Sequence, residues 1–105
     1  MSNKELIENC VLLDQKSYED LTYLFKMFAD STRLKIFTVL AYKECSVNEL
    51  TEVLGVTQSA VSHQLSTLRA ANLVKYRKDK QTVYYSLQDN HVMMIFKQAL
   101  EHVKE

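Results

Sequence analysis

The sequence predicts a mainly α-helical domain with one β-hairpin near its C-terminal end. Three observations support this fold class. The 105 residues include one glycine and no proline, which favours helices joined by short connections. Apolar residues recur at helical spacing over most of the chain. Between residues 73 and 87, apolar and polar residues instead alternate as they do in β-strands.

The composition indicates one globular unit. A length of 105 residues is typical of a single domain, so residues 1–105 are expected to fold together. The longest apolar runs are far too short for a signal peptide or a membrane span, which indicates a cytoplasmic protein. In that compartment Cys10 and Cys45 are expected to be reduced and to behave as small buried hydrophobic residues.

The net charge is zero, but the charges are unevenly distributed. Residues 1–30 carry three lysines against six acidic residues, a balance of −3. Residues 57–85 carry five basic residues against one acidic residue, a balance of +4. A basic segment in a neutral chain fits a polyanionic partner, and it fits an ordinary solvated surface equally well.

Three helices are predicted in the first 42 residues. They span residues 4–14, 18–29 and 29–42, and Asp30 or Ser31 can cap the third helix. Each carries apolar side chains at helical spacing. The predicted apolar faces consist of Leu6, Ile7, Cys10 and Leu13, then Leu21, Leu24, Phe25 and Phe28, then Leu34, Phe37, Val39, Leu40 and Ala41.

Two short helices separated by a glycine follow. In SVNELTEVLG, Ser46 and Glu49 fit the capping box that begins a helix. Gly55 suits the left-handed residue that ends it. The segment TQSAVSHQLSTLRAANL, capped by Thr57 or Ser59, then forms the second helix. This arrangement predicts a helix-turn-helix. The predicted inward-facing residues are Val47, Leu50, Val53, Leu54, Val61, Leu65 and Leu68.

The outer face of the second helix is polar but almost uncharged. Small hydrogen-bonding groups without bulk suit a face that lies against base edges, and the alternative is a polar surface without a partner. The side chains of this face are Gln58, Ser59, Ser62, His63 and Ser66.

A basic hairpin is predicted directly after this helix. In LVKYRKDKQTVYYSL, two alternating segments flank a turn at residues 78–81. A hairpin in this place makes the fold a winged helix-turn-helix, with the order of four helices, a recognition helix, two strands and a final helix. The tip of the hairpin would reach phosphates or a minor groove.

The final helix, predicted to begin near Asn90, carries two histidines. His91 and His102 are eleven residues apart, which is about three turns and about 16 Å of rise, so they share a face but cannot bind one ion together. Asp89 lies two residues before the first histidine, and Glu105 lies three residues after the second. The chain therefore offers two half-sites, each with one nitrogen and one oxygen ligand.

An antiparallel pairing of two such helices would join the half-sites. In a twofold homodimer, each site would contain two imidazoles and two carboxylates, a set that suits zinc and also accepts cobalt or nickel. The alternative is an amphipathic helix with surface histidines. The two predicted faces are Val92, Phe96, Ala99 and Val103 toward the core, and His91, Ile95, Gln98 and His102 along the dimer seam.

Five segments together resemble the ArsR/SmtB family of bacterial metal-sensing repressors, over roughly residues 20–105. They are FADSTRLKIFTVL, ECSVNEL, GVTQSAVSHQLSTLRAANLVKYRKD, VYYSL and DNHVMMIFKQALEHVKE. The resemblance implies a dimeric winged helix that binds double-stranded operator DNA when metal-free and releases it when metal binds.

The resemblance also implies a metal site. The zinc-responsive branch has an Asp-x-His pair early in its last helix and a His-x-x-Glu or His-x-x-His eleven residues later. Asp89, His91, His102 and Glu105 match this pattern in type and spacing, which implies Zn(II), Co(II) or Ni(II) as effector. Another branch uses a Cys-x-Cys, where this chain has serine and asparagine at positions 46 and 48, so a soft-metal thiolate site is not predicted.

The leading interpretation is a metal-responsive transcriptional repressor and not an enzyme. Relatives often have glycine and a basic residue at the wing tip, where this chain has Lys80 and Gln81. A winged-helix regulator without metal sensing, or one regulated through Cys10 and Cys45, is the alternative. A zinc hydrolase is disfavoured, because four protein ligands leave no position for water. The candidate DNA-binding residues are Thr57, Gln58, Ser59, Ser62, His63, Gln64, Lys75, Arg77, Lys78 and Lys80.

Overall fold

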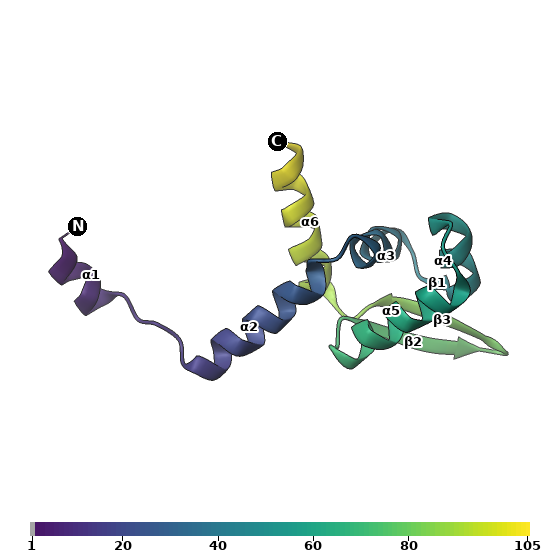
Figure 1. Ribbon diagram of the computed structural model, residues 1–105, viewed down its shortest axis with the longest axis horizontal. Helices are drawn as coiled ribbons and strands as arrows, with labels where there is room; N and C mark the ends of the chain where they lie inside the picture. Colours follow the sequence, from purple (N-terminus) through teal and green to yellow (C-terminus); the bar gives the residue numbers. More distant parts are fainter. Residues whose placement is uncertain (1) are drawn as a thin grey trace.

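The computed structural model describes residues 2–105 and has the winged helix-turn-helix fold that the sequence predicted (Figure 1). Helix α5 is the recognition helix, and β2 and β3 form the wing. The elements of these residues are, in chain order, α1 (Asn3–Asn9), α2 (Gln15–Phe28), α3 (Ser31–Tyr42), β1 (Cys45–Ser46), α4 (Val47–Leu54), α5 (Gln58–Ala70), β2 (Val74–Asp79), β3 (Thr82–Leu87) and α6 (Asn90–Lys104).

The helix-turn-helix is fixed by local hydrogen bonds. The Ser46 hydroxyl accepts from the Glu49 backbone N–H at 3.1 Å, and the Glu49 carboxylate accepts from the Ser46 N–H at 3.0 Å, which confirms the predicted capping box. Gly55 ends α4 with a φ of 67°, in the left-handed region. Thr57, not Ser59, caps α5. The turn between α4 and α5 is therefore set by residues close together in sequence.

A second left-handed residue turns the chain from α5 into β2. Asn72 has a φ of 59°, and its N–H donates to the Arg69 carbonyl at 3.0 Å. The N–H of Leu73 donates to the Leu68 carbonyl at 2.9 Å, which completes a Schellman motif. Leu68 and Leu73 are both buried, so the helix end is sealed by an apolar contact as well.

The sheet has three antiparallel strands in the order β1–β3–β2. The wing turn contains only Lys80 and Gln81, so it is shorter than the predicted four residues, and Lys80 has a φ of 58°. Strand β1 was not predicted, because two residues are too few to show a periodicity. It pairs Cys45 with Tyr85 and thereby joins the helix-turn-helix to the wing.

The core lies between α3, α4, α5, the sheet and the first half of α6. Phe37 is fully buried; its ring stacks on that of Phe28 at 4.7 Å and lies 6.2 Å from that of Phe96. These aromatic contacts bring α2, α3 and α6 together at one point. The buried residues are Ile36, Phe37, Leu40, Cys45, Leu50, Val61, Leu65, Leu68, Leu73, Val74, Leu87, Val92 and Phe96.

Helices α1 and α2 extend away from this core (Figure 1). Neither helix contains a buried residue. The first helix ends at Asn9, so the prediction of a helix over residues 4–14 was too long. Several predicted inward-facing residues are exposed, because helical spacing identifies an apolar face but not what covers it. They are Leu6, Ile7, Cys10, Leu13, Leu21, Phe25, Leu34, Val53, Ala99 and Val103.

Candidate nucleic-acid interface and metal half-sites

The outer face of α5 is available to a partner. Val61, Leu65 and Leu68 bury the opposite face of the helix in the core. The five polar residues predicted for the outer face are all exposed in the single chain, and they are Gln58, Ser59, Ser62, His63 and Ser66. The recognition helix therefore presents hydrogen-bonding groups and little bulk, as contact with base edges requires.

Gln64 differs from these neighbours because another residue of the protein binds its side chain. Its side chain is half-buried, and its Oε1 accepts from Arg33 Nε at 2.7 Å. Arg33 Nη1 also lies 3.5 Å from Met27 Sδ. The guanidinium thus connects the end of α2 and the start of α3 to the recognition helix. Sequence reasoning missed Arg33, which lies 31 residues before its partner.

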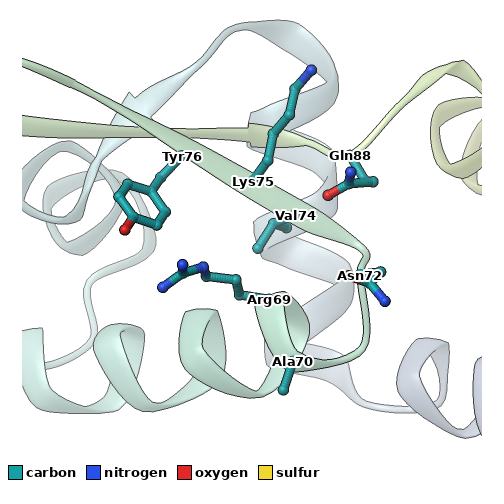
Figure 2. A pocket seen from close by; sticks show the side chains of 7 residues that line it. All are labelled: Arg69, Ala70, Asn72, Val74, Lys75, Tyr76 and Gln88. Atoms are coloured by element: carbon teal, nitrogen blue, oxygen red, sulfur yellow. The ribbon is translucent and has the colours of Figure 1, made fainter.

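The inner face of the wing packs against the end of α5. The Arg69 guanidinium lies 4.2 Å from the centre of the Tyr76 ring, and Lys75 points from the opposite side of the strand (Figure 2). Such a cation–π contact holds β2 against the recognition helix. A pocket of about 480 Å³ lies beside it, without a carboxylate, thiol or imidazole in its lining. The lining residues are Arg69, Ala70, Asn72, Val74, Lys75, Tyr76 and Gln88.

The basic residues of the wing do not all point the same way. Because side chains alternate along a strand, Lys75 and Arg77 share the outer face, and Lys78 lies on the face of Tyr76. The Arg77 guanidinium binds the Glu44 carboxylate, and this hydrogen bond is the main reason that the pKa of Glu44 is lowered. Arg77 is therefore already engaged in the DNA-free chain.

The two ends of α6 carry the predicted histidine–carboxylate pairs. His91 Nδ1 lies 3.6 Å from Asp89 Oδ1, and His102 Nδ1 lies 3.6 Å from Glu105 Oε2. The imidazoles are 90% and 85% exposed. Asp89 also caps the helix by accepting from Val92 N–H at 3.2 Å, and this bond, followed by the adjacent imidazole, holds the pKa of Asp89 below its usual value.

Each pair is half of a metal site at most. Within residues 2–105 of a single chain, no three histidine, cysteine, aspartate or glutamate side chains come together around one point. A closed zinc site takes four ligands, and imidazole and carboxylate are both suitable. The donor types of each pair therefore fit Zn²⁺. One pair supplies only two of the four ligands, so a second pair is required. Cys10 is exposed and Cys45 is buried, and burial raises the pKa of the Cys45 thiol.

Comparison with known proteins identifies the family. Residues 30–76 match the family described as "Bacterial regulatory protein, arsR family". The transcriptional repressor SmtB homolog of Synechocystis sp. is 43% identical over 93 residues, which are 89% of this chain and 69% of that protein. The chain belongs to the ArsR family. The cadmium resistance transcriptional regulatory protein CadC homolog of Staphylococcus aureus is 36% identical over 87 residues, 82% of this chain and 72% of that protein.

Solved structures of similar proteins share the fold. The structure of HlyU from Vibrio cholerae has a TM-score of 0.80 and 34% sequence identity, and the match covers 88% of this chain and all of that one. The protein is thus a DNA-binding transcriptional regulator and not an enzyme. Within residues 2–105, every helix is too short or too polar to span a bilayer. The ArsR-family match ends in β2, so α6 and its half-sites lie outside it.

Proposed function

We propose that this ArsR-family regulator is a homodimeric repressor that releases operator DNA when Zn(II), or else Co(II) or Ni(II), binds between its C-terminal helices. The observation that carries the proposal is the pair of exposed histidine–carboxylate half-sites at opposite ends of α6, Asp89/His91 and His102/Glu105. Two relatives are named as an SmtB homolog and a cadmium resistance regulator, which supports a metal effector.

A twofold dimer satisfies the geometry of α6. The two histidines are eleven residues apart, which corresponds to about 16 Å of helix, so one chain cannot join its own half-sites. Antiparallel α6 helices would set each early half-site against the late half-site of the partner, and symmetry makes this contact twice. The exposed apolar residues of α1 and α2 supply further surface for a second copy. Residues 1–105 would then act as one domain that is complete only in the dimer.

The proposed DNA contacts divide by element. The outer face of α5 would read bases in the major groove through Gln58, Ser59, Ser62 and His63. Phosphates would be met by the helix cap and by three lysines of the wing. These phosphate-binding residues are Thr57, Lys75, Lys78 and Lys80. Two recognition helices related by a twofold axis would select an operator with two half-sites.

When bound, the metal ion would link two α6 helices and favour a dimer shape in which the recognition helices no longer match the operator. Linkage makes this effect reciprocal, so DNA must weaken metal binding by the same factor. The expected coupling is about 1–3 kcal/mol for each ligand. The residues of this chain act by holding imidazole nitrogens toward the partner, and protons compete with the metal ion for these nitrogens, so metal affinity should fall as the pH is lowered.

The test measures the affinity of the dimer for a DNA duplex selected from a random pool by the metal-free protein. Added Zn²⁺ should weaken this binding in the wild type and in Lys97→Ala, which removes an exposed side chain of α6 outside both half-sites. His102→Ala should bind the duplex normally without metal and lose the response. An unchanged affinity in wild type with Zn²⁺, or a full response in His102→Ala, would contradict the proposal.

Thiol regulation is the second candidate, favoured by the exposed position of Cys10. Metal titration of protein with alkylated cysteines separates the two. Stoichiometric binding that survives alkylation supports the α6 sites, and its loss supports a cysteine site. Burial and the raised pKa of Cys45 disfavour that residue as a reactive thiol, because the thiolate is the reactive form.

A further inference from the structure

A contact across the outer face of the sheet ties the wing to the helix-turn-helix. Arg77 of β2 donates its Nε–H to the two carboxylate oxygens of Glu44, at 3.2 and 3.1 Å, and its Nη2 donates to the same group. Glu44 lies 33 residues earlier in the chain. The Tyr84 ring on β3 lies 4.9 Å from Cζ of Arg77. We call this group of three residues, Glu44, Arg77 and Tyr84, the outer clasp.

The strand register explains why the outer clasp lies where it does. Arg77 and Ser46 both pair with Tyr84, on opposite sides of β3. Ser46 is also the cap of α4, so Glu44 stands two residues before the cap of the first helix of the helix-turn-helix. Strand β1 has only two residues, which limits how much backbone pairing joins the two units. The outer clasp extends this short junction with a side-chain bond.

The chemistry of the outer clasp favours a defined geometry over a large contribution to stability. Hydrogen bonds from one guanidinium to both oxygens of a carboxylate fix the relative orientation of the two groups. The Arg77 and Glu44 side chains are 54% and 39% exposed, and exposed ion pairs contribute little to folding. Glu44 also neutralises one basic residue of the wing, which would weaken a purely electrostatic attraction to DNA.

We propose that Glu44 and Arg77 position the wing for operator DNA, and that Arg77 acts through Glu44 and not as a phosphate contact. The inner face of the wing is already held by the contact of Arg69 with Tyr76, so the outer clasp would fix the remaining freedom of the hairpin. This inference rests on the DNA contacts proposed above.

The direction in which Glu44→Ala changes the affinity for DNA distinguishes a positioning role from a purely electrostatic one. Glu44→Ala removes a negative charge from a DNA-binding unit, so electrostatics alone predicts tighter binding. Positioning predicts binding weaker by about five- to tenfold in Glu44→Ala, with Arg77→Ala similar and the double variant no weaker than either single variant. Arg77→Lys should also weaken binding, because lysine keeps the charge but not the bidentate geometry.

The experiment measures the affinity of the metal-free dimer for the selected duplex over a series of salt concentrations. If Arg77 contacts no phosphate, Arg77→Ala and Glu44→Ala have the same slope of log affinity against log salt. Lys78→Ala, which removes a proposed phosphate contact, should reduce the wild-type slope by about 0.9. Glu52→Ala is the matched control, because it removes an exposed carboxylate of α4 that has no ion pair within residues 2–105. Its binding should be unchanged or tighter. Thermal unfolding checks that each variant is folded.

Two results would overturn the inference. They are equal or tighter binding in Glu44→Ala, and a slope that is lower by about 0.9 in Arg77→Ala than in Glu44→Ala, which would make Arg77 a phosphate contact. If the wild-type protein binds the duplex and responds to Zn²⁺ but the variants give either of these results, only the proposed role of the outer clasp is refuted. Wild-type protein without a Zn²⁺ response refutes the proposed function and leaves the affinity comparison of the variants valid.

Discussion

The DNA-binding half of the chain and its N-terminal helices have similar apolar patterns but very different burial. In α3, α4 and α5, Phe37, Leu50 and Leu65 are fully buried. In the N-terminal arm, which we define as residues 3–28, Ile7 is 79% exposed and Phe25 is 60% exposed. An amphipathic pattern therefore predicts a buried face only where a partner surface exists. The DNA-binding half finds that surface in its own chain, and the arm does not, except at its C-terminal end, where Phe28 packs against the core.

Helix α6 combines a buried part with an exposed part. Its first half is fixed in the core by Val92 and Phe96. Its second half exposes Leu100 and Val103, and a half-site lies at each end of the helix. A helix that is anchored in the DNA-binding unit and exposed to a second copy of the chain is well placed to couple the DNA-binding unit to that copy. The predictions below test this division, from the largest expected effect to the smallest.

The largest effect is expected in the core. Phe37→Ala should lower the free energy of unfolding by about 3–5 kcal/mol, because a fully buried ring leaves a cavity. Phe25→Ala should cost less than about 0.5 kcal/mol in the monomer, since its ring is mostly exposed. Denaturant unfolding at protein concentrations below the dissociation constant of the dimer measures the free energy of unfolding of both variants. Equal costs would remove the distinction between the core and the arm.

The arm is expected to matter for association. Val11→Asp should raise the dissociation constant of the dimer at least about tenfold, because an unpaired carboxylate would be buried in the interface. Asn3→Asp is the control, since it adds the same charge at an exposed polar position of α1. Sedimentation equilibrium measures the two constants. An unaffected Val11→Asp dimer would show that the arm lies outside the interface.

A smaller effect is expected at the start of α4. Ser46→Ala should cost about 1 kcal/mol of stability by removing the cap, whereas Ser59→Ala, which caps no helix, should be near neutral. The Ser46 backbone N–H lowers the pKa of Glu49, so the contribution of this carboxylate is present above the ordinary pKa of a glutamate. It is lost as the pH falls through the lower, folded-state pKa. Thermal unfolding over a pH series measures both effects.

The smallest effect is expected at the wing tip. Lys80→Gly should stabilise the protein by up to about 1 kcal/mol, because glycine adopts the left-handed conformation of this position without strain. The same substitution should weaken DNA binding slightly, because one basic side chain is lost. Gln81→Gly is the control and should not stabilise the protein, since Gln81 is not in the left-handed region. Thermal unfolding of the two variants decides the point.

Local features of the fold could be predicted well from the sequence. The capping box at Ser46, the left-handed Gly55 and the approach of Asp89 to His91 all involve residues within a few positions of one another. The metal ligand set and the DNA contacts remain predictions, because they depend on a second chain and on DNA. The predicted burial of Val53, Ala99 and Val103 was wrong, since the spacing does not reveal which neighbours exist.

By itself, the sequence determined the order of the helices, the start and end of α4, the hairpin, and the separation of the two half-sites. These depend on backbone geometry and on side chains that lie within about a turn of each other. Only the tertiary structure revealed strand β1 and the contacts of Glu44 with Arg77 and of Arg33 with Gln64, across 33 and 31 residues. Such contacts arise from packing of distant segments, and a single sequence carries no local signal of which polar side chains that packing will bring together.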